Sequence, residues 1–315
     1  MRAIILGGTG AIGGATASRL AAAGWTVDVV GRDPAAMPAE LASINVRFHA
    51  VERSDTRGIQ QLVGDGVDLL VDLLAYRGAD VRELLPVMAS AATAVLVSSR
   101  AVYVDSFGRH VNGGAPPRFD GAIKEDTPTL PPAGNDVDPF SREGYARSKV
   151  AAEQVALDSG LPVTIIRPSK VHGRWARNAR TRSFVERMLR GERAIALADR
   201  GTSIDHLSAA VNTAALIETI AVQPAPRILN SADPDTPNAE QIVRAIGTRL
   251  DWGGRLELLD NGDPHPERGQ HPWRSAHPMV LDTTASELLG YVPVGSGLDL
   301  IMEEVDWVAT HLNAR

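Results

Sequence analysis

Two side chains four residues apart in the middle of the chain have the types and spacing needed to move a proton. Tyr145 and Lys149 lie in residues 145–153, which read as a helix, so both are expected on one face of it. A phenol with an ordinary pKa of about 10 is a poor acid or base at neutral pH, and a neighbouring ammonium lowers that pKa. Ser99 follows the apolar run 94–97, where an open α/β sheet binds ligands, so its hydroxyl could hold a substrate oxygen.

A glycine-rich segment near the start of the chain has the pattern of a dinucleotide-binding turn. Residues 7–13, GGTGAIG, directly follow the apolar run 3–6 and precede the helix-forming run 15–23. The glycines at its first, fourth and seventh positions would let the backbone turn, approach a pyrophosphate and pack helix against strand. Gly24 ends that helix and residues 25–30 supply another strand, which completes the context that the motif requires. The alternative is a glycine turn without a ligand.

The end of the second expected strand predicts which nicotinamide cofactor binds. An acidic residue there would hydrogen-bond the adenosine ribose and repel a 2′-phosphate, whereas this chain has Gly31 and Arg32. A guanidinium matches phosphate oxygens, so we expect NADP(H) in preference to NAD(H). The alternative is that Arg32 is a solvated loop charge, with Asp33 beside it opposing phosphate binding.

Composition excludes several classes of protein. The 315 residues contain no cysteine, which rules out disulfides, thiolate metal sites and cysteine nucleophiles. The net charge of -6 argues against a general nucleic-acid binder. The most apolar stretch, residues 67–74, is too short and too acidic to span a bilayer, and no leader precedes the first strand. We therefore expect a cytoplasmic enzyme without a membrane segment.

Apolar strands alternate with helical segments over the first half of the chain, as in a parallel sheet covered on both faces. Further strands are expected at residues 45–49, 67–74, 94–97 and 163–166, and further helices at 59–63, 81–91 and 145–159. The predicted fold class is α/β, a Rossmann-type doubly wound parallel sheet with a smaller C-terminal substrate-binding lobe.

The expected domains share one chain in an interleaved way. Residues 1–169 plus about 205–231 form the dinucleotide-binding Rossmann domain, and about 170–204 and 232–315 form the substrate-binding lobe. The Pro- and Gly-rich stretch 108–139 is too long for an ordinary connection and is either a functional lid or a disordered insertion. Within it, turn chemistry is expected to order residues 124–128.

Taken together, these motifs resemble the extended short-chain dehydrogenase/reductases, including the NAD-dependent epimerase/dehydratase group. The matching segments are residues 7–13, Asp55, residues 98–103 (SSRAVY), Tyr145 with Lys149, residues 167–173 (RPSKVHG), residues 289–291 (LGY) and Trp307. The resemblance implies hydride transfer, with Tyr145 as the general acid/base. It also implies that Lys149 holds the nicotinamide ribose and lowers the tyrosine pKa, and that Ser99 orients the reacting carbonyl or alcohol.

The resemblance extends these expectations to the cofactor site and to assembly. The expected cofactor-binding residues are Gly7, Thr9, Gly10, Ala11, Ile12, Gly13, Arg32, Asp55, Leu74, Ala75, Tyr145, Lys149, Pro168 and Val171. A homodimer through the helices at residues 81–91 and 145–159 is implied as well.

Departures from the family pattern narrow the activity. Sugar dehydratases carry two acidic residues after the serine position, and Arg100 and Ala101 stand there instead. Residues 206–209, HLSA, keep only the histidine of the sugar-nucleotide pattern, and residues 75–78 resemble atypical members related to plastid RNA-binding proteins.

The substrate is expected to contact the second lobe. The expected substrate-binding residues are Arg100, Lys170, His172, Trp175 and Arg182. Arginines at 174, 177, 180 and 182 could clamp a phosphate or carboxylate, or form a solvated face. His-Pro pairs recur from His265 to His277, but no local helix could align them, so no metal is expected. Residues 264–278 are expected to close over substrate, with Trp273 as an apolar wall.

Three functions remain open. The leading one is an NADP-dependent oxidoreductase that acts on a carbonyl or secondary alcohol of a small metabolite, anionic or nucleotide-linked. The second is a nucleotide-sugar epimerase that retains NAD. The third is a non-catalytic dinucleotide-sensing or RNA-associated protein. The complete Ser99, Tyr145 and Lys149 set and the acidic net charge count against that third function.

Overall fold

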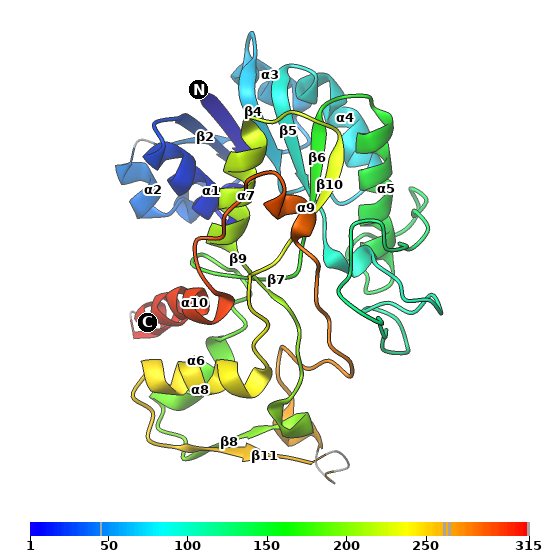
Figure 1. The fold of residues 1–315 in the computed structure, drawn as a ribbon. Coiled ribbons are helices and arrows are strands. Elements are labelled where there is room, and N and C mark those ends of the chain that lie inside the picture. Colours follow the sequence, from blue (N-terminus) through cyan, green and yellow to red (C-terminus); the bar gives the residue numbers. More distant parts are fainter. Residues whose placement is uncertain (45, 261–262, 264–265, 314–315) are drawn as a thin grey trace.

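The computed structural model describes residues 1–44, 46–260, 263 and 266–313, and a seven-stranded sheet forms its centre (Figure 1). Its strands are β1 (Arg2–Leu6), β2 (Thr26–Gly31), β3 (Val46–Ala50), β4 (Val67–Asp72), β5 (Ala91–Val97), β6 (Val163–Pro168) and β10 (Arg227–Ser231). Every pair in the order β10-β6-β5-β4-β1-β2-β3 is parallel. The predicted α/β fold class is confirmed.

Helices cover both faces of this sheet, which explains why its inner strands are apolar throughout. One face carries α1 (Ala11–Ala22) and α7 (Ala210–Ala221), and the other carries α3 (Thr56–Val63), α4 (Gly78–Met88) and α5 (Gly144–Asp158). The short α2 (Ala39–Ser43) packs beside β3.

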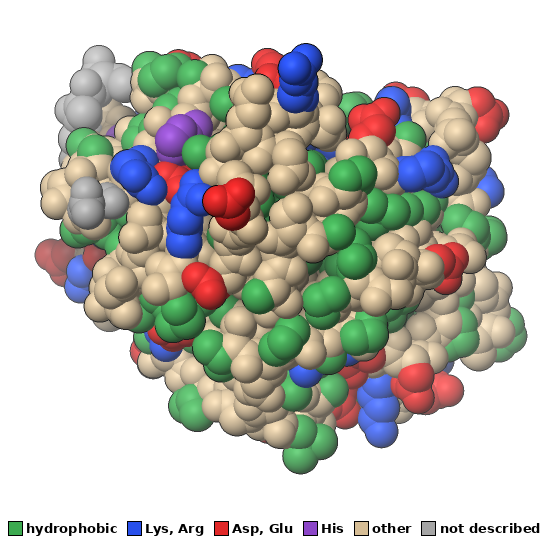
Figure 2. Space-filling view, turned by 90° about the horizontal axis from the view of Figure 1, so that it is seen from above, with side chains coloured by type: hydrophobic (Ala, Val, Ile, Leu, Met, Phe, Trp, Pro, Cys, Tyr) green, Lys and Arg blue, Asp and Glu red, His purple; other side chains and the backbone are tan. Residues whose placement is uncertain are grey.

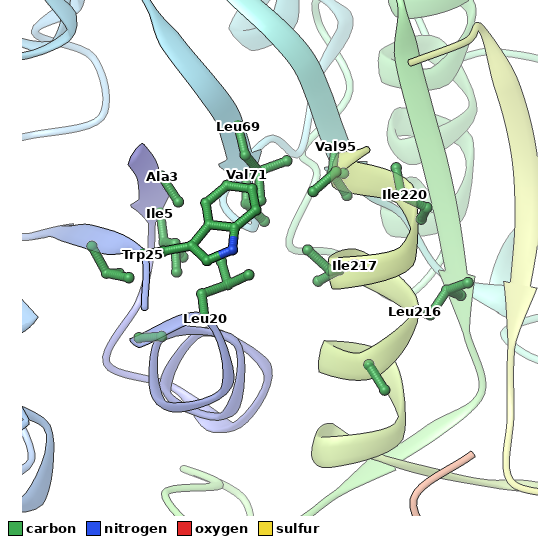
Figure 3. Packing of buried hydrophobic residues seen from close by; sticks show 14 of the residues in the cluster. Ala3, Ile5, Leu20, Trp25, Leu69, Val71, Val95, Leu216, Ile217 and Ile220 are labelled. Atoms are coloured by element: carbon green, nitrogen blue, oxygen red, sulfur yellow. The ribbon is translucent and has the colours of Figure 1, made fainter. Parts of the chain in front are cut away.

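Trp25 fills the core on the face that carries α1 and α7. Its indole lies among Leu20 of α1 and the strand residues Leu69 and Val71, and Ile217 of α7 closes the same cluster (Figure 3). All four neighbours are fully buried, and burial of side chains this large contributes about 1.5–3 kcal/mol each. This packing fixes α1, and with it the turn that precedes the helix.

On the opposite face, α4 and α5 approach closely at a glycine. A Cβ on Gly78 would lie 3.0 Å from the carbonyl oxygen of Ala151, so a side chain there would push the two helices apart. Ala152 and Ala156 of α5 continue the contact with small buried side chains. The packing holds α5, which carries Tyr145 and Lys149, at a defined height over β5 and β6.

A smaller lobe lies below the carboxyl ends of the strands (Figure 1). Its elements are β7 (Lys170–His172), β8 (Ala194–Leu197), β9 (Leu207–Ala209), β11 (Arg255–Leu258), α6 (Arg182–Leu189), α8 (Ala239–Arg249) and α10 (Gly297–Asn313). The buried Glu304 of α10 accepts hydrogen bonds from the Gly173 N–H at 3.0 Å and from the Thr181 hydroxyl at 2.8 Å. This carboxylate ties the C-terminal helix to the start of the lobe.

The remaining described elements are short. They are the 3-10 turns η1 (Pro34–Ala36), η2 (Arg100–Val102), η3 (Ala198–Gly201) and η4 (Pro266–Gly269), together with α9 (Thr284–Glu287). The segment after α9 packs on the sheet, because Tyr291 belongs to the core cluster of Trp25. This segment therefore packs with the Rossmann domain, although residues 232–315 were expected to belong to the second lobe.

Most expected elements are found close to their expected limits, with two corrections. The strand expected over 67–74 ends at Asp72, whose carboxylate accepts the Leu74 N–H at 2.9 Å and turns the chain. The helix expected over 81–91 ends at Met88, and Ala91 already belongs to β5.

The stretch 108–139 was expected to be either a functional lid or a disordered insertion. It is a loop anchored by the buried Asp105, which accepts hydrogen bonds from the backbone N–H groups of Arg109 and Arg118, and its role as a lid stays a prediction. Asn45, expected to start β3, lies outside the described residues.

The surface seen from above mixes charges of both signs (Figure 2). Within the described part of the chain, no helix is both long enough and apolar enough to cross a membrane.

Candidate active site

The glycine turn between β1 and α1 has the geometry of a phosphate-binding turn. Gly7 has φ +89°, a left-handed conformation that favours glycine, and its N–H bonds the Val30 carbonyl at 2.9 Å. A Cβ on Gly13 would lie 2.5 Å from the Gly7 oxygen, so only glycine permits this approach of helix to turn. A Cβ on Gly10, in contrast, would have one neighbour, at 4.0 Å. The turn is therefore closed toward the sheet and open at the start of α1.

The other expected cofactor residues lie at the same carboxyl edge of the sheet. A Cβ on Gly7 would lie 2.9 Å from Leu74 Cγ, and one on Gly31 would lie 3.9 Å from the Thr9 methyl group. Those contacts place the ends of β2 and β4 beside the turn. The remaining expected residues on this edge are Ala11 and Ile12 in the first turn of α1, Ala75 after β4, Pro168 at the end of β6 and Val171 in β7.

Arg32 directly follows β2 and is exposed, and it forms no ion pair with any described residue. The neighbouring Asp33 is engaged elsewhere, because its carboxylate accepts the Ala35 N–H at 2.9 Å at the start of η1. Asp55 caps α3 through a 2.9 Å bond from the Gly58 N–H and remains exposed. The guanidinium is thus available to an anion beside the turn.

Ser99, Tyr145 and Lys149 converge where β5 ends against α5. The Ser99 hydroxyl lies close enough to Tyr145 to affect its pKa, and Lys149 lies one helical turn after the tyrosine. Burial raises the pKa of Tyr145 above its ordinary value, and the neighbouring Ser99 hydroxyl opposes that rise. The family resemblance implies that Lys149 lowers the pKa of Tyr145. In the structure this pKa is raised instead.

Lys149 is buried with its ammonium directed at main-chain oxygens. Its Nζ donates to the Ala75 carbonyl at 2.7 Å and to the Val97 carbonyl at 3.0 Å, the ends of β4 and β5. Burial lowers its pKa to about 8, partly opposed by the negative charges of Asp72 and Glu153. An ammonium has three N–H donors, so one remains for a hydroxyl at this edge.

Sequence reasoning missed the aromatic residue that covers this lysine. The ring of Tyr76 lies 4.7 Å from Lys149 Nζ, and its centroid is 6.3 Å from that of Tyr145 and 5.0 Å from that of Phe140. The segment that contains Tyr76 was singled out only as atypical for the family. A cation–π contact between a loop and a helix leaves no local sequence signal, because it joins residues 73 positions apart.

A buried ion pair holds α5 behind the site. Glu153, one turn beyond Lys149, binds Arg167 of β6 at 2.5 Å and the Ser98 hydroxyl. Burial lowers the pKa of Arg167, but Glu153 more than offsets this effect and raises that pKa above its ordinary value. The Arg167 guanidinium also lies 4.7 Å from the centroid of the Tyr103 ring. These contacts connect β5, β6 and α5 directly beneath the three candidate catalytic side chains.

Only part of the expected substrate set gathers near this edge. Arg100 and Lys170 converge on the buried Asp205, at 2.6 Å and 2.9 Å respectively. His172 is instead 1% exposed and its Nε2 is 2.9 Å from Asp233. The expectation that it faces substrate is not supported, because its ring packs inside the lobe.

The other two expected substrate residues also lie apart from the three candidate catalytic side chains. Trp175 packs on α1 at Gly14, with the cluster on the face of the sheet opposite α5. Arg182 is partly exposed and pairs with Glu186 at 3.7 Å within α6. Neither contact is with Ser99, Tyr145 or Lys149.

The four arginines that were expected to form one cluster have different surroundings. Arg174 pairs with Glu40 at 2.8 Å, Arg177 is exposed, and Arg180 approaches Arg100 and Lys170 closely enough to lower the pKa of both. No single clamp of the four arginines forms.

The position of Trp273 in the His-Pro segment also differs from expectation. Trp273 is 1% exposed and stacks on Phe184 at 5.6 Å, so it belongs to the core of the lobe rather than to a substrate wall. Pro264 and His265 lie outside the described residues. Among the residues that are described, no group of three or more His, Asp or Glu side chains is arranged to hold a metal.

A cavity of about 370 Å³ lies away from the three candidate catalytic side chains. Residues of α1, α7 and α10 line it, five of them alanines, together with residues 172–175 and Ala209 of β9. Ser99, Tyr145 and Lys149 do not line this cavity, so we place the candidate active site at the strand ends and not here.

A protein-family model matches most of the chain. The family model described as "NAD dependent epimerase/dehydratase family" matches residues 3–230. No curated protein matches the chain.

Solved structures share the fold over almost the whole chain. A dTDP-glucose 4,6-dehydratase from Bacillus anthracis is 16% identical with a TM-score of 0.74, covering 99% of this chain and 98% of that one. A UDP-glucuronic acid 4-epimerase from Bacillus cereus is 16% identical with a TM-score of 0.72 and covers 99% and 100%. A putative epimerase from Burkholderia cenocepacia is 20% identical with a TM-score of 0.73, covering 98% of each chain. At these identities the likeness concerns the fold.

Proposed function

The chain belongs to the NAD dependent epimerase/dehydratase family, and from this premise we propose that it catalyses hydride transfer between a nicotinamide dinucleotide and a carbonyl or secondary alcohol of a small metabolite. The convergence of Ser99, Tyr145 and Lys149 at the edge that carries the glycine turn is the observation that supports this most strongly. The second lobe, about residues 170–204 and 232–315 apart from the segment at Tyr291 that packs on the sheet, would then bind substrate and supply the other wall of the site.

The residues at the strand ends fit a dinucleotide. The turn at Gly7 is held in a conformation that favours glycine, and a side chain at Gly13 would be excluded by the Gly7 oxygen. The start of α1 would bind the pyrophosphate through its N–H groups. When bound, the cofactor supplies the hydride or accepts it.

Three side chains of this protein handle the proton and the substrate oxygen. The Ser99 hydroxyl orients that oxygen, and Tyr145 Oη donates a proton to it on reduction or removes one on oxidation. The third N–H of Lys149 binds a ribose hydroxyl, which fixes the ring that carries the reacting carbon. Burial raises the pKa of Tyr145, which keeps the phenol protonated at neutral pH but also makes it a weaker acid.

We propose NADP(H) as the preferred cofactor. Arg32 is exposed at the end of β2 without an ion-pair partner among the described residues, and Asp33 is committed to η1. A free guanidinium at this position can pair with a 2′-phosphate through two parallel hydrogen bonds.

The experiment for this function follows absorbance at 340 nm with NADPH, or with NADP⁺ in the reverse direction, over a panel of small carbonyl compounds and secondary alcohols. We expect turnover with at least one compound and its loss in Tyr145→Phe. Full turnover in that variant would contradict the proposal.

A nucleotide-sugar epimerase is the second candidate, and the family match is the observation in its favour. It would oxidise and reduce one substrate carbon without releasing NAD. It therefore predicts stoichiometric nucleotide in the purified protein and no net consumption of NADPH. Dehydration of the sugar-dehydratase type is not proposed, because Arg100 and Ala101 replace the two acidic residues after Ser99.

We also propose a homodimer that pairs α4 and α5 with the same helices of a second copy. The two helices lie side by side on one face of the sheet, and the exposed side chains along them include Arg82, Glu83 and Arg147. Sedimentation of the wild-type chain at a mass of two chains would support this assembly, and a single-chain mass would contradict it.

A further inference from the structure

Three cationic side chains and one carboxylate lie together at the carboxyl ends of β5 and β6. Arg100 directly follows Ser99, and Lys170 follows Pro168 at the end of β6 by two residues. The two converge on Asp205, with N–O distances of 2.6 Å and 2.9 Å. Arg180 completes the group, which we call the Asp205 cluster.

The positive charge of this cluster exceeds its negative charge. Burial lowers the pKa of Arg100 and of Lys170, the Asp205 carboxylate opposes that lowering, and the charge of Arg180 adds to it. Asp205 is the carboxylate that pairs with both cations. One carboxylate therefore balances three cations, and such an arrangement is unfavourable in a buried place unless an anion joins it.

Two donors of the cluster have no hydrogen-bond partner within the described chain. Arg100 is 8% exposed and its Nη1 is buried without a partner. Arg180 Nε is also buried and unpaired. Unpaired buried donors cost about 1–3 kcal/mol each, so their presence at one place points to a ligand that accepts hydrogen bonds.

We propose that the Asp205 cluster binds an anionic oxygen group of the substrate, a carboxylate or a phosphate ester, beside the carbon that reacts. Guanidinium groups bind such groups through paired hydrogen bonds, and Lys170 adds a point charge. Because Ser99 and Arg100 are consecutive, the anionic group and the reacting oxygen would be held from one turn, η2. The position of the substrate rests on the proposed function, whereas anion binding can be tested without catalysis.

A substitution of Asp205 tests the proposal, because anion binding by the cluster and a purely structural role predict opposite changes in anion affinity. Replacing it by the similarly shaped asparagine removes the competing negative charge and leaves all three cations. We expect Asp205→Asn to bind anions several-fold more tightly than the wild type. A purely structural role of Asp205 would give weaker binding or none.

The experiment is isothermal titration of the full-length protein with inorganic phosphate and with malonate, at an ionic strength held constant with sodium chloride. Arg100→Gln and Arg180→Gln should each weaken binding by about tenfold or more. The control is Arg190→Gln, at an exposed position whose nearest carboxylate, that of Glu192, is 3.8 Å away, and it should bind as the wild type does. Arg180 is less buried than Arg100, so its variant provides the test if Arg100→Gln does not fold.

The outcomes separate the sources of the anion and the two proposals. Tighter binding of malonate assigns the group to a carboxylate, and tighter binding of phosphate assigns it to a phosphate ester. Two results would overturn the proposal. One is anion binding that is unchanged in both arginine variants, which would place the anion elsewhere, for example at the glycine turn. The other is that neither probe binds. Failure of the proposed function would show separately, as a chain that binds no dinucleotide or whose Tyr145→Phe variant keeps full turnover.

Discussion

Lys149 and Tyr76 face one another across the carboxyl edge of the sheet, with the ammonium 4.7 Å from the ring centroid. The ring covers one side of a lysine that also donates to the carbonyl oxygens of Ala75 and Val97. Burial in this setting is what lowers the pKa of Lys149 to about 8. The contact joins the loop after β4 to α5, so it fixes the position of the tyrosine–lysine pair.

Stability should depend on pH through Lys149. Its folded-state pKa of about 8 lies below the ordinary value of 10.5, so between these values the unfolded chain binds more protons. This lysine's contribution to the free energy of unfolding should therefore rise from pH 8 to pH 10.5. The measurement compares urea unfolding of the wild type and Lys149→Met across that range. The difference, wild type minus variant, should increase with pH; a flat difference would contradict the lowered pKa.

Removal of one hydroxyl should nearly abolish catalysis. Tyr145→Phe loses the proposed acid/base, so kcat should fall by about 10²–10⁴-fold while cofactor affinity stays within a few-fold. Steady-state kinetics and fluorescence titration with NADPH would check both quantities. The matched variant is Tyr76→Phe, which keeps the ring over Lys149 and should change kcat only a few-fold. Equal losses in both variants would argue against a special role for Tyr145.

Cofactor preference should depend on one guanidinium. Arg32→Ser should weaken NADPH binding by about tenfold or more, because the 2′-phosphate loses its partner, and should leave NADH binding almost unchanged. Arg57→Ser, at an exposed position on α3, is the control. Dissociation constants for both dinucleotides decide the question. Wild-type protein that prefers NADH would reject the assignment.

The ion pair behind the site should matter for stability. Glu153→Gln leaves the buried Arg167 without its counter-charge, which should lower the free energy of unfolding by about 3–5 kcal/mol. The partly exposed pair of Arg182 and Glu186 offers the comparison, and Glu186→Gln should cost less than about 1 kcal/mol. Chemical denaturation of the two variants would measure both. Similar small losses would show that Glu153 is not essential to the packing of α5.

Local spacing predicted the parts of this protein whose signal is local. The glycines of residues 7–13 and the interval from Tyr145 to Lys149 each describe a single turn or one helix face, and the apolar runs defined the strands. The expected strand over residues 67–74 was too long because a side chain, Asp72, ends it by binding the Leu74 N–H. Hydrophobicity alone does not report such a hydrogen bond.

Contacts between distant segments could not be predicted in the same way. His172 was expected at the substrate, but Asp233, 61 residues later, binds it inside the lobe. Asp205 drew no attention in the sequence, although it brings Arg100 and Lys170 together. Both cases depend on how the two lobes pack, which is determined by tertiary contacts rather than by residue spacing.

The most direct test of the account is nucleotide binding at the glycine turn. The freshly purified protein is denatured, any released nucleotide is identified by mass spectrometry, and refolded protein is titrated with NADPH and NADH beside Gly13→Val. The account predicts that the wild type binds one nicotinamide dinucleotide per chain in the titration and that the variant binds none, because its side chain would meet the Gly7 oxygen. Wild-type protein that releases no nucleotide and binds neither dinucleotide, or a variant that binds as well as the wild type, would contradict it.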